Sequence, residues 1–432
     1  MPQNREPTLP PGWPRNACVV GLGYVGLPTA AVLASTGLPV LGVDTNEAVI
    51  SGLNGGGCHL QEPGLHDLLR GGLEAGTLRV ETQPKPSDVF VICVPTGLAA
   101  GPVADLAHVR AASEQVVEHL RPGTLVILES TVPPGTTLQI VGPIMTQSGL
   151  RLGEDLFLAH CPERVMPGRL LAELRGNDRV IGGADPISAK LARQLYARFV
   201  EGDVHLTDAT SAELVKLSEN AFRDVNIAFA NELAAVADTV GVDVWDVIRL
   251  ANLHPRVNIL QPGPGVGGDC IPVDPWFIVQ SAPEACGLLR AARAINDEAP
   301  RRLAALILRL LGDLPPRVAI LGAAYKGGVA DTRSSPAAAV VEELERSGVQ
   351  VRVTDPRATC FCRPLCDLPA AVADASLLAV LADHPEYVRL EPRALAELTP
   401  ARVVVDARRC LDAGAWQAAG FAVHVPGGGE VS

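Results

Sequence analysis

The chain has 432 residues, more than one hydrophobic core usually organises, so we expect two or three domains. A hydrophobic content of 47% with 19% charged residues is typical of a soluble globular protein, and the net charge of −12 argues against nucleic acid or an anionic membrane as a partner. No apolar run is long enough to span a bilayer, and ten cysteines in so long a chain indicate reduced thiols of a cytosolic protein.

The first half of the chain is predicted to begin with a βαβ unit. After residues 1–15, which we expect to form a disordered arm, the pattern predicts a strand at 17–20, a helix to about Ser35 and a strand at 39–43. Three later apolar runs, at 89–94, 125–128 and 157–159, are predicted to be strands. Residues 106–120 are predicted to form a helix. This alternation predicts a doubly wound parallel sheet over residues 16–205.

Residues 206–300 are predicted to form a helical connector. Thr210-Ser-Ala-Glu213 fits a capping box, and apolar residues then recur at helical spacing until Gly241, which predicts one long helix. A second helix near 244–252 and a glycine-rich loop at 263–268 complete the region. So long a helix is expected to join domains or to pair with its copy, so we expect a homodimer.

The βα pattern returns over residues 301–432. Predicted strands lie at 318–321, 351–354 and 403–405, and Ser335-Pro336 begins a helix that ends near Gly348. This is a second, smaller Rossmann-like domain. The fold class is therefore α/β, with two Rossmann-like doubly wound domains joined by a long helical connector.

A dinucleotide motif follows the first predicted strand. In Gly21-Leu-Gly23-Tyr-Val-Gly26 the glycines permit a tight turn, close approach of the pyrophosphate and helix packing, and Asp44 ends the next strand 18 residues after Gly26. A carboxylate there accepts hydrogen bonds from the ribose and repels a 2′-phosphate, which favours NAD over NADP. The predicted NAD-binding residues of this motif are Gly21, Gly23, Tyr24, Val25, Gly26 and Asp44.

A reactive thiol is predicted in Gly265-Val-Gly-Gly-Asp-Cys270. A dehydrogenase that continues from an aldehyde to a carboxylate needs a thiolate to hold the aldehyde as a thiohemiacetal and then a thioester. A lone cysteine is more often inert packing. Lys216 and Asn220, four residues apart on the predicted helix, share a face and suggest either a functional pair or a solvated stripe.

Several segments resemble the nucleotide-sugar 6-dehydrogenases of the UDP-glucose/GDP-mannose dehydrogenase family. The long matches are residues 163–168, 212–233 and 250–268, and after about residue 340 only Asp406-Ala-Arg408 matches. The resemblance implies an enzyme that oxidises C6 of a UDP-linked N-acetylhexosamine, UDP-N-acetyl-D-mannosamine, to the uronate with two NAD, for surface polysaccharide synthesis. It also implies that residues 16–205 bind NAD, 206–300 mediate dimerisation and 301–432 bind the UDP-sugar.

The resemblance also assigns roles to residues. It implies that Cys270 is the nucleophile, that Lys216 and Asn220 stabilise the oxyanion, and that Asp274 is their hydrogen-bonding partner. It also implies that Glu163 directs water at the thioester, with Thr131 as a companion. Further cofactor contacts are implied at Pro95, Thr96, Thr131 and Arg333. Substrate contacts are implied at Glu163, Arg164, Val165, Lys216, Asn220, Arg223, His254, Arg256, Asn258, Gly267, Tyr325, Lys326 and Arg408, with Arg256 reaching across the dimer.

Two positions depart from the family pattern, and other functions stay open. Asp269 precedes the thiol where relatives carry His, and a carboxylate there should disfavour the thiolate unless something compensates. After Asp44 the chain lacks the usual basic residue. Alternatives are a UDP-glucose or UDP-N-acetylglucosamine 6-dehydrogenase, a two-electron hydroxyacid-type dehydrogenase that needs no Cys270, and a non-catalytic NAD- or nucleotide-sugar-binding regulator. No metal is expected, because the Cys360, Cys362 and Cys366 cluster lacks a fourth ligand.

Overall fold

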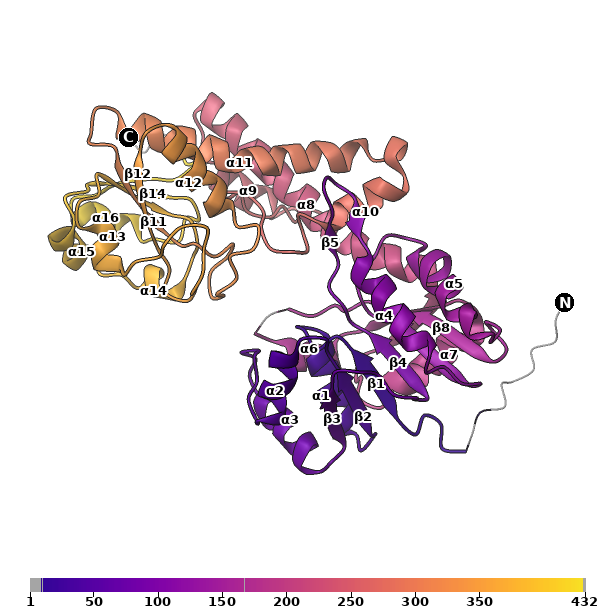
Figure 1. The fold of residues 1–432 in the computed structure, drawn as a ribbon. Helices are drawn as coiled ribbons and strands as arrows, with labels where there is room; N and C mark the ends of the chain where they lie inside the picture. Colours follow the sequence, from indigo (N-terminus) through magenta and orange to yellow (C-terminus); the bar gives the residue numbers. More distant parts are fainter. Residues whose placement is uncertain (1–8, 10, 167, 430–432) are drawn as a thin grey trace. The chain divides into compact units, whose positions relative to one another are not determined.

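The structure is a computed structural model that describes residues 9, 11–166 and 168–429. It divides into two compact units, each with its own sheet (Figure 1). The first unit contains the described residues up to Glu219 and residues Trp276–Pro283, and the second contains Asn220–Pro275 and the described residues from Glu284 onward. Among the described residues, none of the helices combines the length and the apolar character that crossing a bilayer requires.

The first unit is built on an eight-stranded sheet in the order β10-β9-β8-β7-β4-β1-β2-β3. Its strands are β1 (Ala17–Val20), β2 (Val40–Val43), β3 (Leu78–Glu81), β4 (Val89–Ile92), β7 (Thr124–Leu128), β8 (Leu156–His160), β9 (Arg179–Gly183) and β10 (Val204–Asp208). The pairings are parallel except between β8 and β9. A short antiparallel pair, β5 (Gly97–Leu98) and β6 (Ala104–Asp105), stands apart from the sheet.

Helices cover both faces of this sheet, so it is doubly wound. One face packs against α1 (Gly26–Ser35), α3 (Leu65–Glu74), α6 (Leu170–Gly176) and α7 (Pro186–Tyr196), and the other against α4 (Ala107–Val117) and α5 (Gly142–Met145). The remaining helical segments of this unit are α2 (Glu47–Asn54), η1 (Thr137–Val141) and η2 (Thr146–Ser148).

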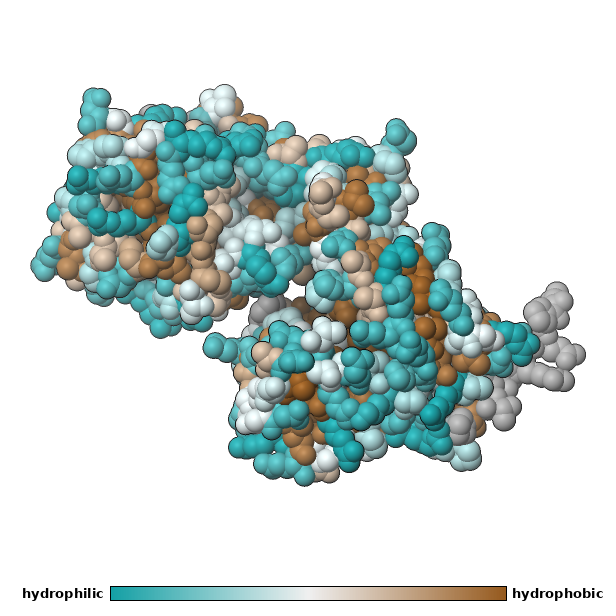
Figure 2. All heavy atoms as spheres, viewed as in Figure 1, coloured by the Kyte–Doolittle hydropathy of each residue, from teal (hydrophilic) through white to brown (hydrophobic). Residues whose placement is uncertain are grey.

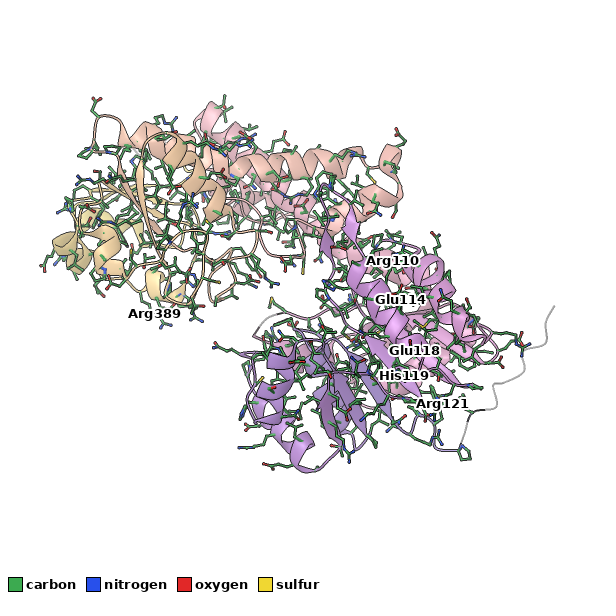
Figure 3. All side chains as sticks on the ribbon, in the orientation of Figure 1. Arg110, Glu114, Glu118, His119, Arg121 and Arg389 are labelled. Atoms are coloured by element: carbon green, nitrogen blue, oxygen red, sulfur yellow. The ribbon has the colours of Figure 1, made fainter. Side chains whose placement is uncertain are left out.

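Helix α4 shows how the sequence pattern sets these packing faces. Its buried residues Val109, Ala112 and Val116 recur at helical spacing and enter the core. Arg110 and Glu114 lie on the opposite, solvent-facing side (Figure 3). The surface view of the same face is largely hydrophilic, with smaller apolar areas between the polar side chains (Figure 2).

The predicted N-terminal arm lies mostly outside the described residues, which omit residues 1–8 and 10. The end of that segment is packed against the first unit. Trp13 packs against the hydrophobic core of this unit, and the Arg15 side chain forms an ion pair with Asp88 at 2.9 Å.

The long helix predicted after residue 210 is α8 (Ala209–Val240), which is 32 residues long. It is followed by α9 (Val244–Ala251), α10 (Asp274–Ser281), η3 (Pro283–Ala285) and α11 (Gly287–Leu311). Helix α11 has 25 residues and no counterpart among the predicted elements, and it is continuous across the boundary expected at residues 300 and 301. It packs on the C-terminal sheet through residues such as Leu303 and Ile307.

The second unit contains a five-stranded, fully parallel sheet in the order β12-β11-β13-β14-β15. These strands are β11 (Arg317–Leu321), β12 (Gln350–Thr354), β13 (Leu377–Val380), β14 (Val403–Asp406) and β15 (Ala422–His424). Helices α11 and α12 (Pro336–Arg346) cover one face, and α13 (Leu368–Val372), α14 (Pro385–Val388), α15 (Pro392–Leu398) and α16 (Ala413–Ala418) cover the other. Two doubly wound sheets and a long helix confirm the predicted fold class, while the antiparallel β9 was not predicted.

Candidate active site

The three motif glycines form the turn between β1 and α1, and each has a different environment. Gly21 has a φ of 91°, and a Cβ there would lie 2.5 Å from the Cys93 carbonyl oxygen. A Cβ on Gly26 would lie 1.9 Å from the carbonyl oxygen of Gly21. Around Gly23, in contrast, a Cβ would meet nothing within 4 Å. The outer glycines are therefore required by packing, and Gly23 borders open space where a pyrophosphate could approach.

Asp44 follows β2 and is held at this turn. Its Oδ2 accepts a hydrogen bond from the Leu22 backbone N–H at 2.9 Å, and its Oδ1 accepts one from Asn46 N–H at 2.8 Å. Each carboxylate oxygen has a further lone pair for a ribose hydroxyl. The turn, the open space at Gly23 and this acceptor fit NAD, the cofactor predicted from the sequence.

The other predicted cofactor residues of the first unit follow neighbouring strands. Pro95 and Thr96 come after β4, and Thr131 comes after β7. The Thr96 hydroxyl donates a hydrogen bond to the Thr131 carbonyl oxygen at 2.6 Å, so the two loops are tied together. Tyr24, in the glycine turn, donates to Glu62 at 2.7 Å.

Glu163 and Lys216 form a nearly buried ion pair within the first unit. The Lys216 Nζ lies 2.7 Å from Glu163 Oε1, and the two side chains are 8% and 13% exposed. The second oxygen of Glu163 accepts the Val165 backbone N–H at 2.8 Å. The pair couples a carboxylate that could act as a general base to a cation that could stabilise an oxyanion.

Arg164, predicted to bind substrate, is engaged inside the first unit. Its guanidinium lies 2.8 Å from a Glu219 carboxylate oxygen and donates to the Asp178 carbonyl oxygen at 2.9 Å. Substrate contact through this side chain would have to compete with those two partners.

The capping box predicted at Thr210 and Glu213 is wrong. Helix α8 begins at Ala209, and Asp208 caps it by accepting hydrogen bonds from both the backbone N–H and the hydroxyl of Ser211. The buried Glu213 carboxylate instead accepts bonds from the backbone N–H groups of Gly135 and Thr137 and from the Thr137 hydroxyl. Burial raises the pKa of Glu213, although these three donors oppose the increase. Those donors lie 76 to 78 residues away, which local spacing cannot reveal.

In the second unit, Asn220 and Asp274 form a buried polar pair. The Asn220 side-chain amide donates to Asp274 Oδ2 at 2.6 Å, and the two residues are 6% and 3% exposed. Asp274 begins α10, and its N–H donates to the Cys270 carbonyl oxygen at 2.9 Å. The thiol of Cys270 is exposed, one turn before the Asp274 carboxylate in the chain. Exposure distinguishes this residue from an inert packing cysteine.

Asp269, the carboxylate next to the thiol, pairs with Arg333. Arg333 forms ion pairs with both Asp269 and Asp331, and its backbone carbonyl accepts the Gly268 N–H at 3.0 Å. The hydrogen bond to Asp331 and the charge of Asp269 raise the pKa of Arg333. The sequence predicted that Asp269 disfavours the thiolate unless something compensates, and the structure places a cation beside Asp269, on a residue predicted to contact cofactor.

The glycine-rich loop lies too close to the C-terminal sheet for larger residues. A Cβ on Gly267 would approach the Tyr325 Cβ to 2.6 Å and the Ser334 carbonyl oxygen to 2.7 Å. A Cβ on Gly263 would approach an Arg408 guanidinium nitrogen to 2.9 Å. Sequence reasoning placed Gly267, Tyr325 and Arg408 in one substrate site, and within the second unit these residues lie together.

Tyr325 and Lys326 follow β11 at the carboxyl edge of the sheet. Arg408 donates to the Tyr325 carbonyl oxygen at 2.9 Å and to that of Leu381 at 3.0 Å. Burial, together with the positive charge of Arg223, lowers the pKa of Lys326. A charge on Cys270 acts to raise the pKa of Tyr325, Lys326 and Arg333, which places these three side chains near the thiol.

The remaining predicted substrate residues lie between α9 and the glycine-rich loop or on α8. His254, Arg256 and Asn258 are exposed, and the Asn258 carbonyl oxygen accepts the Asn226 side-chain amide at 2.8 Å. Arg223 is exposed on α8. The backbone of this segment is therefore anchored to α8, while its cationic side chains face solvent.

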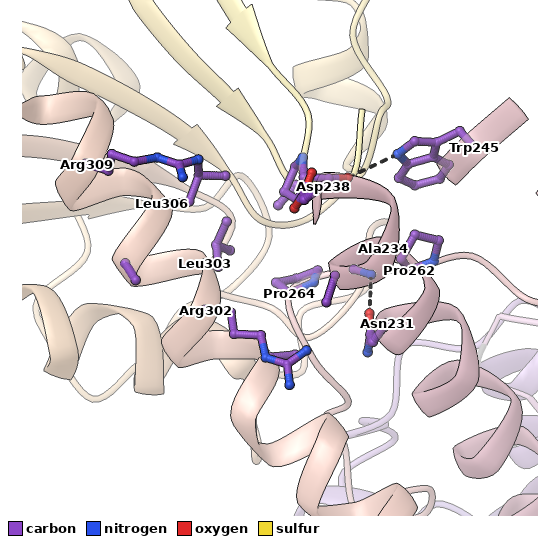
Figure 4. Close-up of a pocket in the computed structure, with 16 residues that line it drawn as sticks. Asn231, Ala234, Asp238, Trp245, Pro262, Pro264, Arg302, Leu303, Leu306 and Arg309 are labelled. Carbon is purple, nitrogen blue, oxygen red and sulfur yellow. Dashed lines mark hydrogen bonds between the residues drawn. The ribbon is translucent and has the colours of Figure 1, made fainter. Parts of the chain in front are cut away.

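The second unit also contains a pocket of about 420 Å³ (Figure 4). Helix α11 contributes Arg302, Leu303, Leu306 and Arg309 to its wall, and α8 and α9 contribute Asn231, Ala234, Asp238 and Trp245. None of the residues predicted to bind substrate or cofactor lines it. We therefore do not assign this pocket as the active site.

The fold and these residues define an NAD-dependent dehydrogenase. Three family descriptions match the chain in order: "UDP-glucose/GDP-mannose dehydrogenase family, NAD binding domain" over residues 15–200, "central domain" over 210–298 and "UDP binding domain" over 319–413. The chain belongs to this family of nucleotide-sugar dehydrogenases, as its sequence predicted.

Individual relatives match over almost their full lengths. The chain is 44% identical to a UDP-N-acetyl-D-mannosamine dehydrogenase of Methanocaldococcus jannaschii, over 96% of this chain and 97% of the relative. It is 43% identical to an NDP-N-acetyl-D-galactosaminuronic acid dehydrogenase of Ralstonia nicotianae, over 94% and 97%. A solved UDP-D-ManNAc dehydrogenase from Pyrococcus horikoshii superposes with a TM-score of 0.91 at 42% identity, over 96% and 100% of the two chains.

Proposed function

We propose that the protein oxidises C6 of UDP-N-acetyl-D-mannosamine from alcohol to carboxylate, giving UDP-N-acetyl-D-mannosaminuronate for surface polysaccharide synthesis. Relatives with that activity in their names are 42 to 44% identical to the chain over 96% of its length. The observation that carries the chemistry is the exposed thiol of Cys270, one turn before the buried Asn220–Asp274 pair. A two-electron dehydrogenase has no use for such a thiol.

Oxidation to the carboxylate removes four electrons from the sugar. NAD, when bound, supplies the hydride acceptor for each of the two oxidations. Loss of a hydride and of the hydroxyl proton turns the C6 alcohol into an aldehyde. The Cys270 thiolate adds to this aldehyde, and the oxygen takes up a proton to give a thiohemiacetal. Loss of a second hydride, with release of that hydroxyl proton to solvent, turns the thiohemiacetal into a thioester. The covalent bond retains the intermediate between the two oxidations. Asn220 is proposed to act with Lys216 in stabilising the oxyanion and holding the reactive water, and Asp274 to be its hydrogen-bonding partner.

The last step is hydrolysis of the thioester. Glu163 takes a proton from water, whose oxygen adds to the thioester carbon, and Lys216 stabilises the oxyanion that forms. Collapse breaks the C–S bond, releases the uronate and returns the thiolate of Cys270. The 2.7 Å contact between Lys216 and Glu163 supports this division of roles, because it places the cation beside the carboxylate that takes the proton from water. Thr131, tied to Thr96, is proposed as their companion.

The three matched family domains suggest which part of the chain performs each function. We propose that residues 16–205 bind NAD, that 206–300 mediate dimerisation and that 301–432 bind the UDP-sugar. The substrate contacts are proposed to come from Arg223, His254, Arg256, Asn258, Gly267, Tyr325, Lys326 and Arg408, together with Arg164 and Val165. In the second unit, the cationic members of this set supply the positive charge that a diphosphate needs in an acidic protein.

A second substrate has specific support. The relative named for N-acetyl-D-galactosaminuronic acid is 43% identical over 94% of the chain, close to the values for the mannosamine enzymes. Whole-chain identity therefore does not separate these two N-acetylhexosamine substrates. UDP-glucose and UDP-N-acetylglucosamine are further alternatives from the sequence.

A substrate panel tests this choice. UDP-linked N-acetylmannosamine, N-acetylgalactosamine, N-acetylglucosamine and glucose would be compared side by side, with the product identified by mass spectrometry. We expect the highest kcat/KM for UDP-N-acetylmannosamine, and a poor value for UDP-glucose, because an acetamido-binding group would be left unpaired. A higher kcat/KM for any other sugar refutes the specific assignment.

We further propose that the enzyme is a homodimer that pairs through α8 and α9. Phe222, Phe229, Val236 and Val240 recur on α8 at intervals of seven, seven and four residues, and they are 64%, 49%, 51% and 63% exposed. Residues at this spacing share one helix face. Exposed apolar residues in such a stripe are typical of a protein interface. Arg256 is proposed to reach the partner's substrate.

A cytoplasmic location is proposed on chemical grounds. All ten cysteines are present as thiols within the described residues, as expected in a reducing compartment. Fractionation of cells that express the protein would test this assignment.

A further inference from the structure

Four residues form a row just beyond the paired strand ends of the first unit. The register pairs Val20 with Ile92, Ile92 with Leu128 and Leu128 with His160. The next residues of the four strands are Gly21, Cys93, Glu129 and Cys161. They continue the sheet face that packs against α1 and α7.

The Glu129 carboxylate in this row is fully buried and accepts four hydrogen bonds from side chains. Its Oε1 accepts from the Arg179 guanidinium at 3.1 Å and from the Tyr196 hydroxyl at 3.0 Å. Its Oε2 accepts from the Cys93 thiol at 3.0 Å and from the Thr29 hydroxyl at 3.3 Å. Side-chain exposure is 0% for Glu129 and 5% for Arg179, so this is a desolvated ion pair with additional neutral donors.

The neighbouring groups are in the protonation states that these bonds require. Burial raises the pKa of Cys93 and Cys161, that of Cys161 to about 11, so both are neutral thiols. Burial also raises the pKa of Tyr196, which keeps its hydroxyl a donor. Arg179 extends the network by contacting the Cys161 sulfur at 3.7 Å and by lying over the Tyr196 ring.

Two of the four side-chain donors to Glu129, Thr29 and Cys93, lie beside the predicted cofactor-binding residues. Thr29 is in α1, directly after the glycine turn, and Cys93 lies two residues before Pro95. A Cβ on Gly26 would lie 2.9 Å from the Cys93 Cβ, so Cys93 packs under that turn. Tyr196, by contrast, ends α7, which carries none of the predicted site residues.

The residues that follow the row are those with proposed roles. Thr131 lies two residues after Glu129, and Glu163 lies two residues after Cys161. A movement of the carboxylate would therefore reach the glycine turn, the Pro95-Thr96 loop and the Thr131 loop together. A buried ion pair adds little net stability, because desolvation offsets its attraction, so a further role would account for its presence.

We propose that Glu129 is a positioning residue, whose carboxylate sets the glycine turn and the cofactor-binding loops of the first unit in the geometry that binds NAD. The extension to Thr131 and Glu163 rests on the proposed function. The part concerning NAD rests only on the glycine turn and the family.

Two conservative variants test this proposal, because each removes one hydrogen bond to the same carboxylate. Thr29→Val removes the donor on α1, beneath the cofactor site, and Tyr196→Phe removes the donor on α7. NAD affinity would be measured by isothermal titration calorimetry without any sugar, and Tm by thermal unfolding. We expect Thr29→Val to raise the Kd for NAD about three- to tenfold, the effect of one lost hydrogen bond. Tyr196→Phe is expected to lower Tm while leaving this Kd unchanged.

Glu129→Gln provides a third measurement, since it keeps the shape of the side chain and removes its charge. Its KM for NAD should rise more than kcat falls, whereas a purely structural role would lower Tm and leave KM unchanged. The proposal would be overturned if Thr29→Val and Tyr196→Phe had equal Kd values for NAD, whether both were raised or both matched the parent. Because the Kd values of Thr29→Val and Tyr196→Phe are measured without sugar, failure of the proposed substrate or thiol chemistry would not alter them.

Discussion

Asp269 and Arg333 show how a single unusual residue is accommodated beside the nucleophile. The sequence raised the concern that a carboxylate next to Cys270 disfavours the thiolate, and the structure answers it with an ion pair to Arg333, 64 residues further along the chain. The pair is half exposed, at 46% for Asp269 and 66% for Arg333, so solvent screens it. We therefore expect the ion pair to have a small, measurable effect on the reactivity of the Cys270 thiol.

Arg333→Gln should shift the reactivity of Cys270 to higher pH. Removing the guanidinium leaves the Asp269 charge unbalanced, and an exposed ion pair of up to about 1 kcal/mol corresponds to less than about one pH unit. The rate of iodoacetamide labelling of the Cys270 peptide, followed by mass spectrometry over a pH series without NAD, measures this. Asp269→Asn in the same background should restore the profile. Identical profiles for the parent and Arg333→Gln would contradict a role for the pair.

Cys270→Ser should abolish formation of the uronate. An alkoxide leaves an ester far less readily than a thiolate leaves a thioester, so turnover should fall by several orders of magnitude. Product analysis by mass spectrometry checks this, and calorimetry should show that Cys270→Ala still binds NAD. Sustained steady-state activity in Cys270→Ser would rule out covalent catalysis, and loss of NAD binding in Cys270→Ala would indicate a structural cysteine.

At the scale of elements, the β1–α1 turn separates glycines needed for packing from the one that borders ligand space. Gly23→Ala should leave the free energy of unfolding nearly unchanged, because its Cβ would meet nothing within 4 Å, and yet weaken NAD binding at least tenfold. Gly26→Ala should destabilise the first unit, since its Cβ would lie 1.9 Å from a carbonyl oxygen. Urea unfolding and NAD titration of both variants test this contrast. Normal NAD binding by Gly23→Ala would place the pyrophosphate elsewhere.

Helix α8 shows where local sequence reasoning succeeds and where it fails. Its existence and length follow from apolar periodicity, which is a property of the segment itself. Its N-terminus was misread, because Glu213 fits a capping box in sequence but is drawn by packing to Gly135 and Thr137. The partners of Glu129, Asp269 and Arg164 were also out of reach, because each lies far away in the chain.

The exposed stripe on α8 predicts a monomeric variant. Phe229→Glu places a charge in the middle of the stripe, where burial against a second copy would be costly. Sedimentation velocity should show the parent as a dimer and the variant as a monomer, while Asp238→Asn, on the opposite side of α8, should remain dimeric. A variant that sediments like the parent would remove α8 from the interface.

At the scale of the whole molecule, the sequence predicted both sheets and the helix between them. Alternating apolar strands and amphipathic helices repeat often enough to define doubly wound domains. The antiparallel β9 and the 25-residue α11 were not predicted, because a strand's direction and the packing of α11 on the C-terminal sheet depend on distant contacts. For the candidate site, the glycine turn and Asp44 could be derived from spacing, whereas the roles of Glu163, Asn220 and Asp274 came from the family resemblance.

The central claim is that one active site carries out both oxidations through a thioester. It is tested most directly by the yield of NADH from a limiting amount of UDP-N-acetylmannosamine, with the sugar product identified at the end point. We expect about two NADH per sugar, and only the uronate as product, because the aldehyde stays bound to Cys270 between the two hydride transfers. A yield of one NADH per sugar with release of the aldehyde would contradict the account.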